Sequence, residues 1–288
     1  MDSTKALREL LAREKLVVAP GAYDCATARL IEQAGFVAVY MTGAGSAAAR
    51  AAMPDYGLLT MTEMVANAAA IARAVAIPVI ADADTGYGNE LNVARTVREY
   101  ERAGVAAIHL EDQTFPKKCG HLDRKEIIPR QAFVARIRAA VEQRQDPNFV
   151  IIARTDAIAV EGFDEAIQRA RAALAAGADV AFVEAPETAE QLRAVPALVE
   201  GPCLLNVVQG GKTPQVSRRE AEQYGYRLAI LPTMLLSAAV KACDQALAHY
   251  RQTGELPPAG EGDNLKALFR RFGADEWDAL RARYAAPA

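Results

Sequence analysis

The sequence predicts an α/β protein with a (β/α)8 barrel, on two observations. A sequence pattern recurs along the chain: an amphipathic, Ala-rich segment is followed by a Gly or Pro turn and then by a short apolar run. Eight such runs occur within 288 residues, and each is continuously apolar rather than alternating. Continuous runs suit strands that are buried on both faces of a parallel sheet. Eight of them, separated by helices, favour a barrel over an open doubly wound sheet.

The predicted units follow one another in order. The apolar runs lie within residues 16–24, 32–43, 74–84, 101–112, 148–157, 174–185, 199–209 and 222–233. The segments between them have helical periodicity, as in 162–177, where Gly177 is a C-terminal stop signal. The first run ends in PGAYD (20–24), which is not the GxGxxG motif of a doubly wound nucleotide-binding sheet.

The last part of the chain departs from the repeat. We expect residues 1–253 to form a catalytic barrel and residues 254–288 to form a helical tail. LPPAG (256–260) has the composition of a linker, and apolar residues follow it at helical spacing. The tail either caps its own barrel or docks on a neighbouring subunit, and the sequence does not distinguish these alternatives.

Composition excludes several classes of protein. The net charge of −3 argues against nucleic acid or an anionic membrane as the main partner. No apolar run approaches the roughly 18 residues of a membrane span, and the charged start carries no secretory core. The four cysteines form no CxxC pair, so a disulfide scaffold or a structural zinc site is not expected. We therefore expect a cytoplasmic protein.

Polar residues gather where the predicted strands end, which is where barrel enzymes place their active sites. Asp82 and Asp84 stand two apart on a segment expected to be extended, so both side chains should point to one side. With Glu111 and Asp112 after the next strand, they form an all-oxygen set that favours Mg²⁺ or Mn²⁺ over zinc. The alternative is that these carboxylates only cap the following helices.

Two further features point to chemistry. Arg154 lies inside an apolar strand and requires an anionic partner, either a substrate carboxylate or a salt bridge to Glu184 or Asp156. The unusually long connection from Gln113 to about Pro129 contains KKCGH (117–121) and is predicted to be a lid. Its flanking lysines should lower the pKa of Cys119 and make the thiol usable for proton transfer, with His121 nearby. The alternative interpretation is that this segment is a solvent-exposed basic loop whose cysteine has no function.

These motifs resemble the isocitrate lyase/phosphoenolpyruvate mutase superfamily. KKCGH closely matches the superfamily's lyase signature, and agreement extends over MPDYG (53–57), 81–88, NVARTV (92–97) and ARTDA (153–157). The similarity runs from about Leu7 to Tyr250, and it is greatest to the 2-methylisocitrate lyase and 2,3-dimethylmalate lyase groups.

The resemblance implies a Mg²⁺-dependent lyase that cleaves a carbon–carbon bond in a 2-hydroxy acid to give pyruvate and a second carboxylate. It implies metal ligation by Asp82, Asp84 and Glu111, partly through water. It also implies a homotetramer whose last helices swap between subunits. The expected catalytic residues are Cys119, Tyr40, Arg154 and His121. The expected substrate-binding residues are Thr42, Gly43, Ala44, Asp55, Gly120, Glu184, Asn206 and Gly211.

In the expected reaction, a base removes the proton of the 2-hydroxyl group, the carbon–carbon bond breaks, and Cys119 protonates the departing carbon. Tyr40 is the candidate base, with a metal-linked carboxylate as the alternative. A separate motif after the seventh strand, QGGK (209–212), forms either a phosphate cradle or a turn that needs glycine.

Departures from the family pattern bear on the substrate. Methylisocitrate lyases have Thr where this chain has Val208, and they have Arg soon after the strand-eight Pro, where this chain has only MLLS (234–237). Both changes remove partners for an additional carboxylate, which favours a smaller dicarboxylate carrying an alkyl group. Oxaloacetate decarboxylation or hydrolysis, phosphonopyruvate chemistry and a non-catalytic barrel are the alternatives.

Overall fold

The computed structural model describes residues 2–122, 124–260 and 264–285. Eight parallel strands close into a barrel in sequence order, each paired with the next and β8 paired with β1. Its strands are β1 (Val17–Ala22), β2 (Val39–Met41), β3 (Val79–Asp82), β4 (Ala107–Glu111), β5 (Val150–Thr155), β6 (Val180–Val183), β7 (Cys203–Asn206) and β8 (Leu228–Leu231). The predicted (β/α)8 barrel is confirmed, with each strand inside its expected run.

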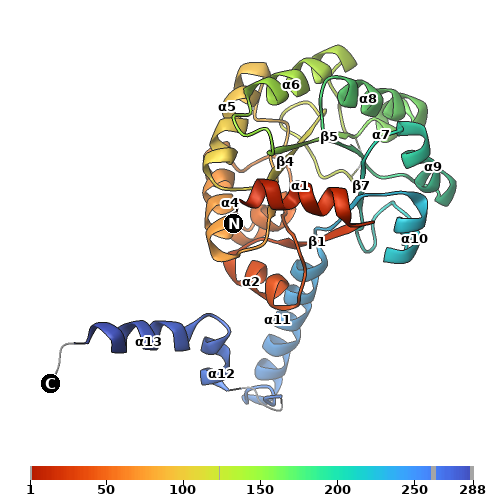
Figure 1. Cartoon of the computed structure of the whole chain (residues 1–288). Coiled ribbons are helices and arrows are strands. Elements are labelled where there is room, and N and C mark those ends of the chain that lie inside the picture. The colour runs from red at the N-terminus through yellow and green to blue at the C-terminus, as the bar shows by residue number, and fades with distance from the viewer. Residues whose placement is uncertain (1, 123, 261–263, 286–288) are drawn as a thin grey trace. The chain divides into compact units, whose positions relative to one another are not determined.

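Helices surround the strands (Figure 1). They are α1 (Ser3–Arg13), α2 (Cys25–Gln33), α3 (Gly43–Ala51), α4 (Met61–Ala74), α5 (Glu90–Arg102), α6 (Arg130–Gln143), α7 (Ile158–Glu161), α8 (Phe163–Ala175), α9 (Ala189–Val199) and α10 (Arg218–Tyr224). The next helix along the chain is α11 (Met234–Thr253). Several begin at side-chain caps; for example, Asp24 and Thr60 each form a reciprocal capping box that satisfies free amide groups of the first turn.

Apolar side chains fill the interior of the barrel. Residues from the strands, among them Tyr40, Ile80 and Phe182, form one buried cluster, and Leu7 and Leu10 of α1 belong to it. Figure 1 shows α1 lying across the barrel in this view. Packing of this kind fills the barrel, so the space available for a ligand lies at the end of the strands opposite α1.

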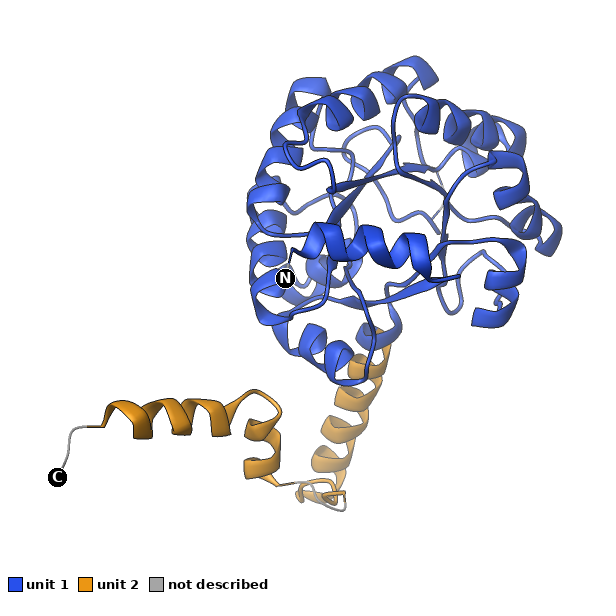
Figure 2. Ribbon diagram, viewed as in Figure 1, with its two compact units in different colours: residues 1–236 blue, residues 237–288 orange. Residues whose placement is uncertain are grey.

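The chain divides into two compact units, residues 1–236 and 237–288, with the division inside α11 (Figure 2). The second unit holds the rest of α11, α12 (Leu265–Arg270) and α13 (Ala274–Tyr284). Residues 261–263 and 286–288 of the expected tail, and residue 123 of the expected lid, lie outside the described residues. Among the helices that the structure describes, none combines the length and apolar character needed to cross a membrane.

Candidate active site

A cavity of about 80 Å³ opens at the carboxyl ends of the strands. It brings together eleven of the residues expected at the site, from six strands or the loops that follow them. Its lining includes Tyr40, Thr42, Ala44, Asp55, Asp82, Cys119, Gly120, His121, Arg154, Glu184 and Asn206. Val208, Ile230, Pro232 and Thr233 complete the wall. The lid, defined here as residues 113–122 and 124–129, therefore contributes directly to this cavity through Cys119, Gly120 and His121.

Asp82 is the buried acid at the end of β3. Its Oδ2 accepts hydrogen bonds from the Gly43 amide at 3.1 Å and from the Tyr40 hydroxyl at 3.3 Å. Burial alone would raise the pKa of Asp82, but His109, Lys117 and Arg154 outweigh it and lower the pKa to about 2. Because Asp82 lines the cavity and is bonded to a side chain as well as to amides, it does more than cap a helix.

The backbone conformation of Asp84 differs from the extended one that the sequence predicts. The strand ends at Asp82, and Asp84 lies in a turn with a left-handed φ of 46°, rather than on an extended segment. Its Oδ1 forms an ion pair with Lys117 Nζ at 2.9 Å. Burial raises the pKa of Asp84 to about 6, with Asp82 and Asp55 adding to the rise and Lys117 opposing it. The two acids thus differ in charge at mildly acidic pH.

Glu111 is buried at the end of β4, and neither carboxylate oxygen makes a hydrogen bond to the described residues. Arg154 Nε lies 3.3 Å from Oε2, and burial raises the pKa of Glu111 well above its usual range. Buried polar atoms without partners are rare in folded proteins, so these oxygens point to a missing ligand. A divalent cation fits them.

Asp112 does not belong to the acid set. It accepts hydrogen bonds from the Thr155 hydroxyl at 2.6 Å and from the Asp156 amide at 2.8 Å, and Arg169 lies 3.2 Å away. The expectation that it joins the metal ligands was wrong because successive strand residues face opposite sides of the sheet. Within the described ranges, no three His, Cys, Asp or Glu side chains are grouped closely enough to hold a metal by themselves.

Arg154 is held in place by acids on several sides. Its Nε lies 2.9 Å from Asp156 Oδ2, and its Nη2 lies 3.6 Å from Glu184 Oε1. The guanidinium also lies over the Phe182 ring, 5.1 Å from its centroid. Burial alone would raise the pKa of Asp156, but Arg154 and Lys125 outweigh it and hold the pKa well below its usual range. The salt-bridge alternative is present, while Arg154 still lines the cavity.

Glu184, at the end of β6, and Asn206, at the end of β7, form a second set of polar side chains on the cavity wall, together with His121 of the lid. Asn206 Nδ2 donates to Glu184 Oε1 at 3.1 Å, and His121 Nε2 lies 3.4 Å from the same oxygen. His121 Nδ1 accepts a hydrogen bond from the backbone amide of Lys212 at 3.1 Å. Gly211 lies against the His121 ring, where a Cβ would approach Nδ1 to 2.8 Å. Gly211 therefore supports the lid and is not part of the cavity wall.

The prediction for the Cys119 thiol was wrong in one respect. Burial raises its pKa to about 11, with Asp55 adding to the rise, whereas the flanking lysines were expected to lower it. The two lysine ammonium groups bind other partners than the thiol. Lys117 Nζ lies 2.5 Å from Asp55 Oδ1, and Lys118 Nζ donates to the carbonyl oxygen of Arg124 at 3.3 Å. A thiol in this environment stays protonated at neutral pH and can donate a proton rather than attack.

Tyr40 forms a buried pair with His109. The Tyr40 hydroxyl lies 2.8 Å from His109 Nε2, and the two rings stack with centroids 5.7 Å apart. Burial, with Asp82 nearby, raises the pKa of Tyr40 well above its usual value, and burial lowers the pKa of His109 to about 4. Both groups are therefore neutral at pH 7, which opposes formation of a phenolate at Tyr40.

Two glycines permit close approaches at the site. A Cβ at Gly43 would lie 2.3 Å from Asp82 Oδ2, and one at Gly120 would lie 2.2 Å from Glu184 Oε1 and 2.3 Å from Arg154 Nη2. Gly43 begins α3 behind the Thr42 cap, and its amide is bonded to Asp82. Gly120 lets the lid rest directly on the Arg154–Glu184 pair.

Sequence reasoning gave Lys117 only an effect on the pKa of Cys119 and assigned no role to His109 or Lys125, although all three are buried at the site. The first two had a visible signal, since Lys117 begins KKCGH and His109 interrupts an apolar strand. Lys125 had none, because an isolated lysine in a polar loop normally reaches into solvent.

The phosphoenolpyruvate phosphomutase family model matches residues 7–251 of the chain. A 2,3-dimethylmalate lyase of Eubacterium barkeri is 52% identical over 242 residues, which cover 84% of each protein. A 2-methylisocitrate lyase of Aeropyrum pernix is 45% identical over 265 residues, 92% of this chain and 83% of that protein.

Solved structures agree with these relatives. A 2,3-dimethylmalate lyase structure superposes with a TM-score of 0.94 at 42% identity and covers 100% of this chain and 97% of its own. Oxaloacetate acetylhydrolase bound to 3,3-difluorooxalacetate gives 0.95 at 39% identity, with 100% and 98% covered. Phosphonopyruvate hydrolase bound to oxalate and Mg²⁺ gives 0.87 at 33% identity, with 99% of both covered. The chain belongs to the phosphoenolpyruvate mutase/isocitrate lyase superfamily.

Proposed function

We propose that the protein is a Mg²⁺-dependent carbon–carbon lyase that cleaves a 2-hydroxy carboxylic acid of the 2-alkylmalate or methylisocitrate type to pyruvate and a second carboxylate. The observation that carries this proposal is that a protonated thiol, a buried arginine and buried acids face one cavity. The high identity to the two lyases supports the reaction class.

The metal would be held by Asp82, Asp84 and Glu111, with Mn²⁺ able to replace Mg²⁺. The oxygens of Glu111 accept no hydrogen bond from the described residues, which supports this assignment, and water would complete the coordination because the acids do not form a closed cluster. When bound, the ion supplies the positive charge that lowers the pKa of the substrate 2-hydroxyl and stabilises the pyruvate product.

The protein's own side chains bind the two ends of the substrate. Arg154 would hold the carboxylate beside the hydroxyl, together with the backbone of Thr42 and Ala44. Glu184 and Asn206, with His121 beside them, would position the far end. Cys119 would donate its proton to the departing carbon, and the lid excludes the water that would compete for that carbon.

The base that accepts the hydroxyl proton is either Tyr40 or a metal-linked carboxylate. The raised pKa of Tyr40 supports the carboxylate, because a neutral phenol is a poor base.

The cavity wall favours a small substrate. Val208 and Ile230 present apolar surface beside the far end, and the cavity of about 80 Å³ leaves little space while the lid is down. A third carboxylate would meet no additional cation among the described lining residues, so an alkyl-substituted dicarboxylate of the dimethylmalate kind fits best.

A substrate panel tests the proposal. Pyruvate release is measured with 2,3-dimethylmalate, other 2-alkylmalates, 2-methylisocitrate and oxaloacetate, each with Mg²⁺ and with excess chelator. We expect metal-dependent pyruvate formation, fastest with a 2-alkylmalate. Absence of pyruvate from every hydroxy acid would reject the lyase.

Oxaloacetate hydrolysis or decarboxylation is the second candidate, favoured by the similarity to oxaloacetate acetylhydrolase over the whole chain. The same panel separates it, because hydrolysis of oxaloacetate gives oxalate and acetate, and decarboxylation gives pyruvate and CO2 from oxaloacetate, whereas neither reaction releases pyruvate from a hydroxy acid. Phosphonopyruvate turnover is followed by phosphate release.

We also propose a cytoplasmic homotetramer in which the last helices dock on a partner subunit. Exposed apolar side chains on the second unit support the docking, and four free cysteines support a reducing compartment. Light scattering during gel filtration measures the mass, and a monomer at micromolar concentration would reject the assembly.

A further inference from the structure

Lys125 is a buried cation of the lid for which the proposed reaction gives no role. Its side chain is only 1% exposed, although lysine is among the residues least often buried. Burying an ammonium group is costly unless ionic and hydrogen-bonding partners compensate it. Its partners should therefore show what this charge does.

The ammonium joins the lid to the barrel. Lys125 Nζ donates to the carbonyl oxygen of Gly120 and, at 2.9 Å, to Asp156 Oδ1. Gly120 is next to Cys119 in the lid, whereas Asp156 follows β5. A single side chain thus crosses from the far arm of the lid to hold the segment that covers the cavity.

Asp156 is a fixed anchor for this contact. Its amide donates to Asp112 Oδ1 at 2.8 Å, and Asp112 is in turn paired with buried Arg169. The Asp156 carboxylate also accepts from Arg154 Nε at 2.9 Å and Nη2 at 3.2 Å. The same carboxylate therefore binds both the lid lysine and the arginine that faces the substrate.

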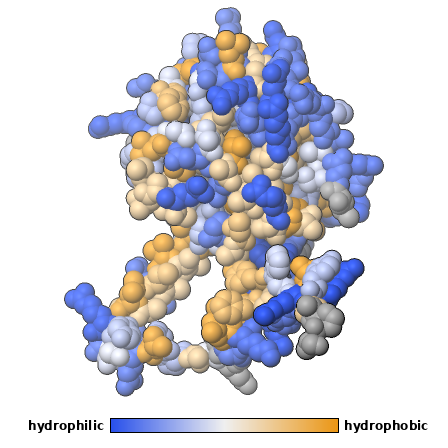
Figure 3. Space-filling view, turned by 90° about the vertical axis from the view of Figure 1, so that its left-hand side faces the viewer, coloured by the Kyte–Doolittle hydropathy of each residue, from blue (hydrophilic) through white to orange (hydrophobic). Residues whose placement is uncertain are grey.

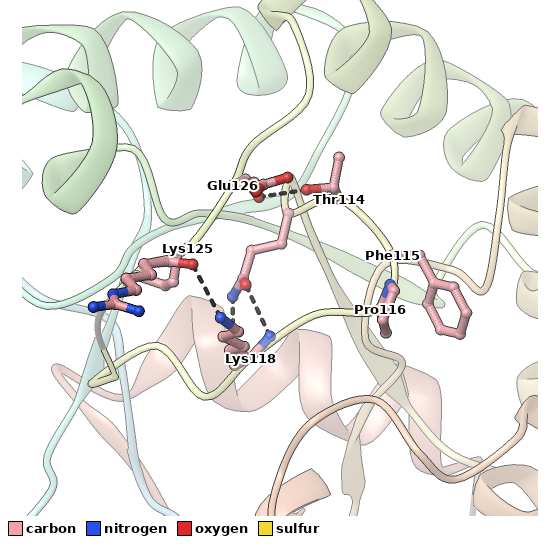
Figure 4. Close-up of a pocket in the computed structure, with 8 residues that line it drawn as sticks. Thr114, Phe115, Pro116, Lys118, Lys125 and Glu126 are labelled. Atoms are coloured by element: carbon pink, nitrogen blue, oxygen red, sulfur yellow. Dashed lines mark hydrogen bonds between the residues drawn. The ribbon is translucent and has the colours of Figure 1, made fainter.

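Hydrogen bonds that do not involve Lys125 hold the two ends of the lid to each other. Gln113 exchanges two hydrogen bonds with the backbone of Lys118, at 2.8 and 3.0 Å, and Thr114 donates to the carbonyl oxygen of Glu126 (Figure 4). These bonds surround a side cavity of about 240 Å³. They fix the two arms to each other but do not tie the Cys119–His121 segment to β5.

We propose that Lys125 is a positioning residue that latches the lid over the active site by joining the Gly120 carbonyl to Asp156, and that this latch also orients Arg154. When the lid is down, Lys125 Nζ and Arg154 Nη2 both donate to Asp156 Oδ1, and Arg154 Nε donates to Asp156 Oδ2. Without the ammonium, the Gly120 segment loses its tie to β5, and Arg154 faces a carboxylate that is less constrained. This role rests on the proposed function for its effect on turnover, but not for its effect on the lid.

The test measures lid opening directly. Holoenzyme with Mg²⁺ is treated with iodoacetamide, and the labelling of the Cys119 peptide is followed by mass spectrometry, so that the exposed Cys25 and Cys243 do not interfere. Lys125→Met should be labelled at Cys119 at least about 10-fold faster than the wild type, because a buried ion pair is broken. Arg124→Met removes a positive charge from an exposed lid residue and serves as the control, expected within about twofold of the wild type.

Turnover gives a second readout. In Lys125→Met, kcat should fall by about 100-fold while KM changes by less than about 5-fold, because protonation by Cys119 needs the closed lid. Lys125→Arg restores the charge and should recover most of both the protection of Cys119 and kcat.

The outcomes are decisive in either direction. Labelling of Cys119 at the wild-type rate in Lys125→Met would overturn the latch, even if the variant is less heat-stable. Should Lys125→Met fail to fold, Lys125→Gln replaces it: faster labelling than the wild type supports the latch, and an unchanged rate overturns it. Because labelling needs no substrate, the latch can fail or hold independently of the lyase assignment.

Discussion

The carboxyl ends of the barrel strands, called the mouth of the barrel here, differ from the C-terminal unit in which side chains are buried and which are exposed. At the mouth, charged residues such as Asp82, Arg154 and Lys125 are buried, each beside oppositely charged groups. In the C-terminal unit, apolar residues such as Leu265, Phe269 and Trp277 are exposed. None of the described residues of α11, α12 or α13 is buried. Orange patches mark exposed apolar residues on the surface in Figure 3. The barrel buries its apolar side chains in its own core, whereas the second unit leaves apolar side chains exposed.

This contrast suggests that chemistry and assembly are separable. Buried charges are retained at a cost because they act on a ligand, and a large exposed apolar surface marks a protein interface. Substitutions at the mouth should therefore change turnover without changing the number of subunits, and substitutions in the C-terminal unit should change the number of subunits first.

The largest effect is expected at Asp82, the proposed metal ligand. Asp82→Ala should lower kcat/KM by at least about 1,000-fold, since Mg²⁺ loses a charged ligand and Gly43 loses its acceptor. Calorimetric titration with Mg²⁺ should show weaker binding, while light scattering gives the wild-type mass. Unchanged Mg²⁺ dependence in this variant would rule out the metal assignment.

Replacement of the thiol comes next. Cys119→Ser keeps the size of the side chain but makes a much weaker acid, so kcat should fall by about 100-fold. Metal binding and subunit mass should stay as in the wild type. If the variant retains full activity, Cys119 is not the proton donor.

A charge placed on the apolar surface of the second unit should alter assembly. Phe269→Asp on α12 should weaken subunit association by at least about 10-fold, since the side chain can no longer be buried in an interface. Lys266→Ala on the same helix is the matched control. Association is measured by sedimentation at several concentrations, and an unaltered profile for Phe269→Asp would remove this surface from the interface.

The smallest effect concerns pH. Burial raises the pKa values of Asp84 and Asp112 to about 6 and that of Glu111 well above its usual range. These three carboxyl groups bind more protons in the folded state than in the unfolded state between pH 7 and about pH 5, which stabilises the metal-free protein as the pH falls through this window. Burial lowers the pKa of His109 to about 4 and also lowers that of His121, so these two rings oppose the trend. Because the three carboxyl groups outnumber the two rings, we expect a net gain in stability.

Asp82 does not oppose this trend, because its lowered pKa costs stability only below about pH 4. Thermal unfolding of the chelator-treated protein at pH 7.5 and pH 5.5 measures the effect. A lower melting temperature at pH 5.5 would contradict these pKa shifts.

The pattern of residues determined much of the architecture and the site. Eight buried apolar runs can be satisfied only by a sheet covered on both faces, and the carboxyl ends of its strands must then meet at one edge. That is why Tyr40, Asp82 and Glu111 could be placed together before any coordinates. KKCGH led to the prediction that Cys119 is a proton donor in the long loop after β4, and the structure places this residue on the cavity wall.

Only the tertiary structure decided the electrostatics of the site. Cys119 was expected to have a lowered pKa from its neighbours in sequence, but the pKa rises because burial and Asp55 act on the thiol while Lys117 turns to other partners. Asp112 faces away from the acids beside it, and Lys125 gains its partner from β5. Sequence spacing fixes which residues are close along the chain, whereas a pKa or a buried ion pair depends on distances in space and on the exclusion of water, which arise only when remote segments pack together.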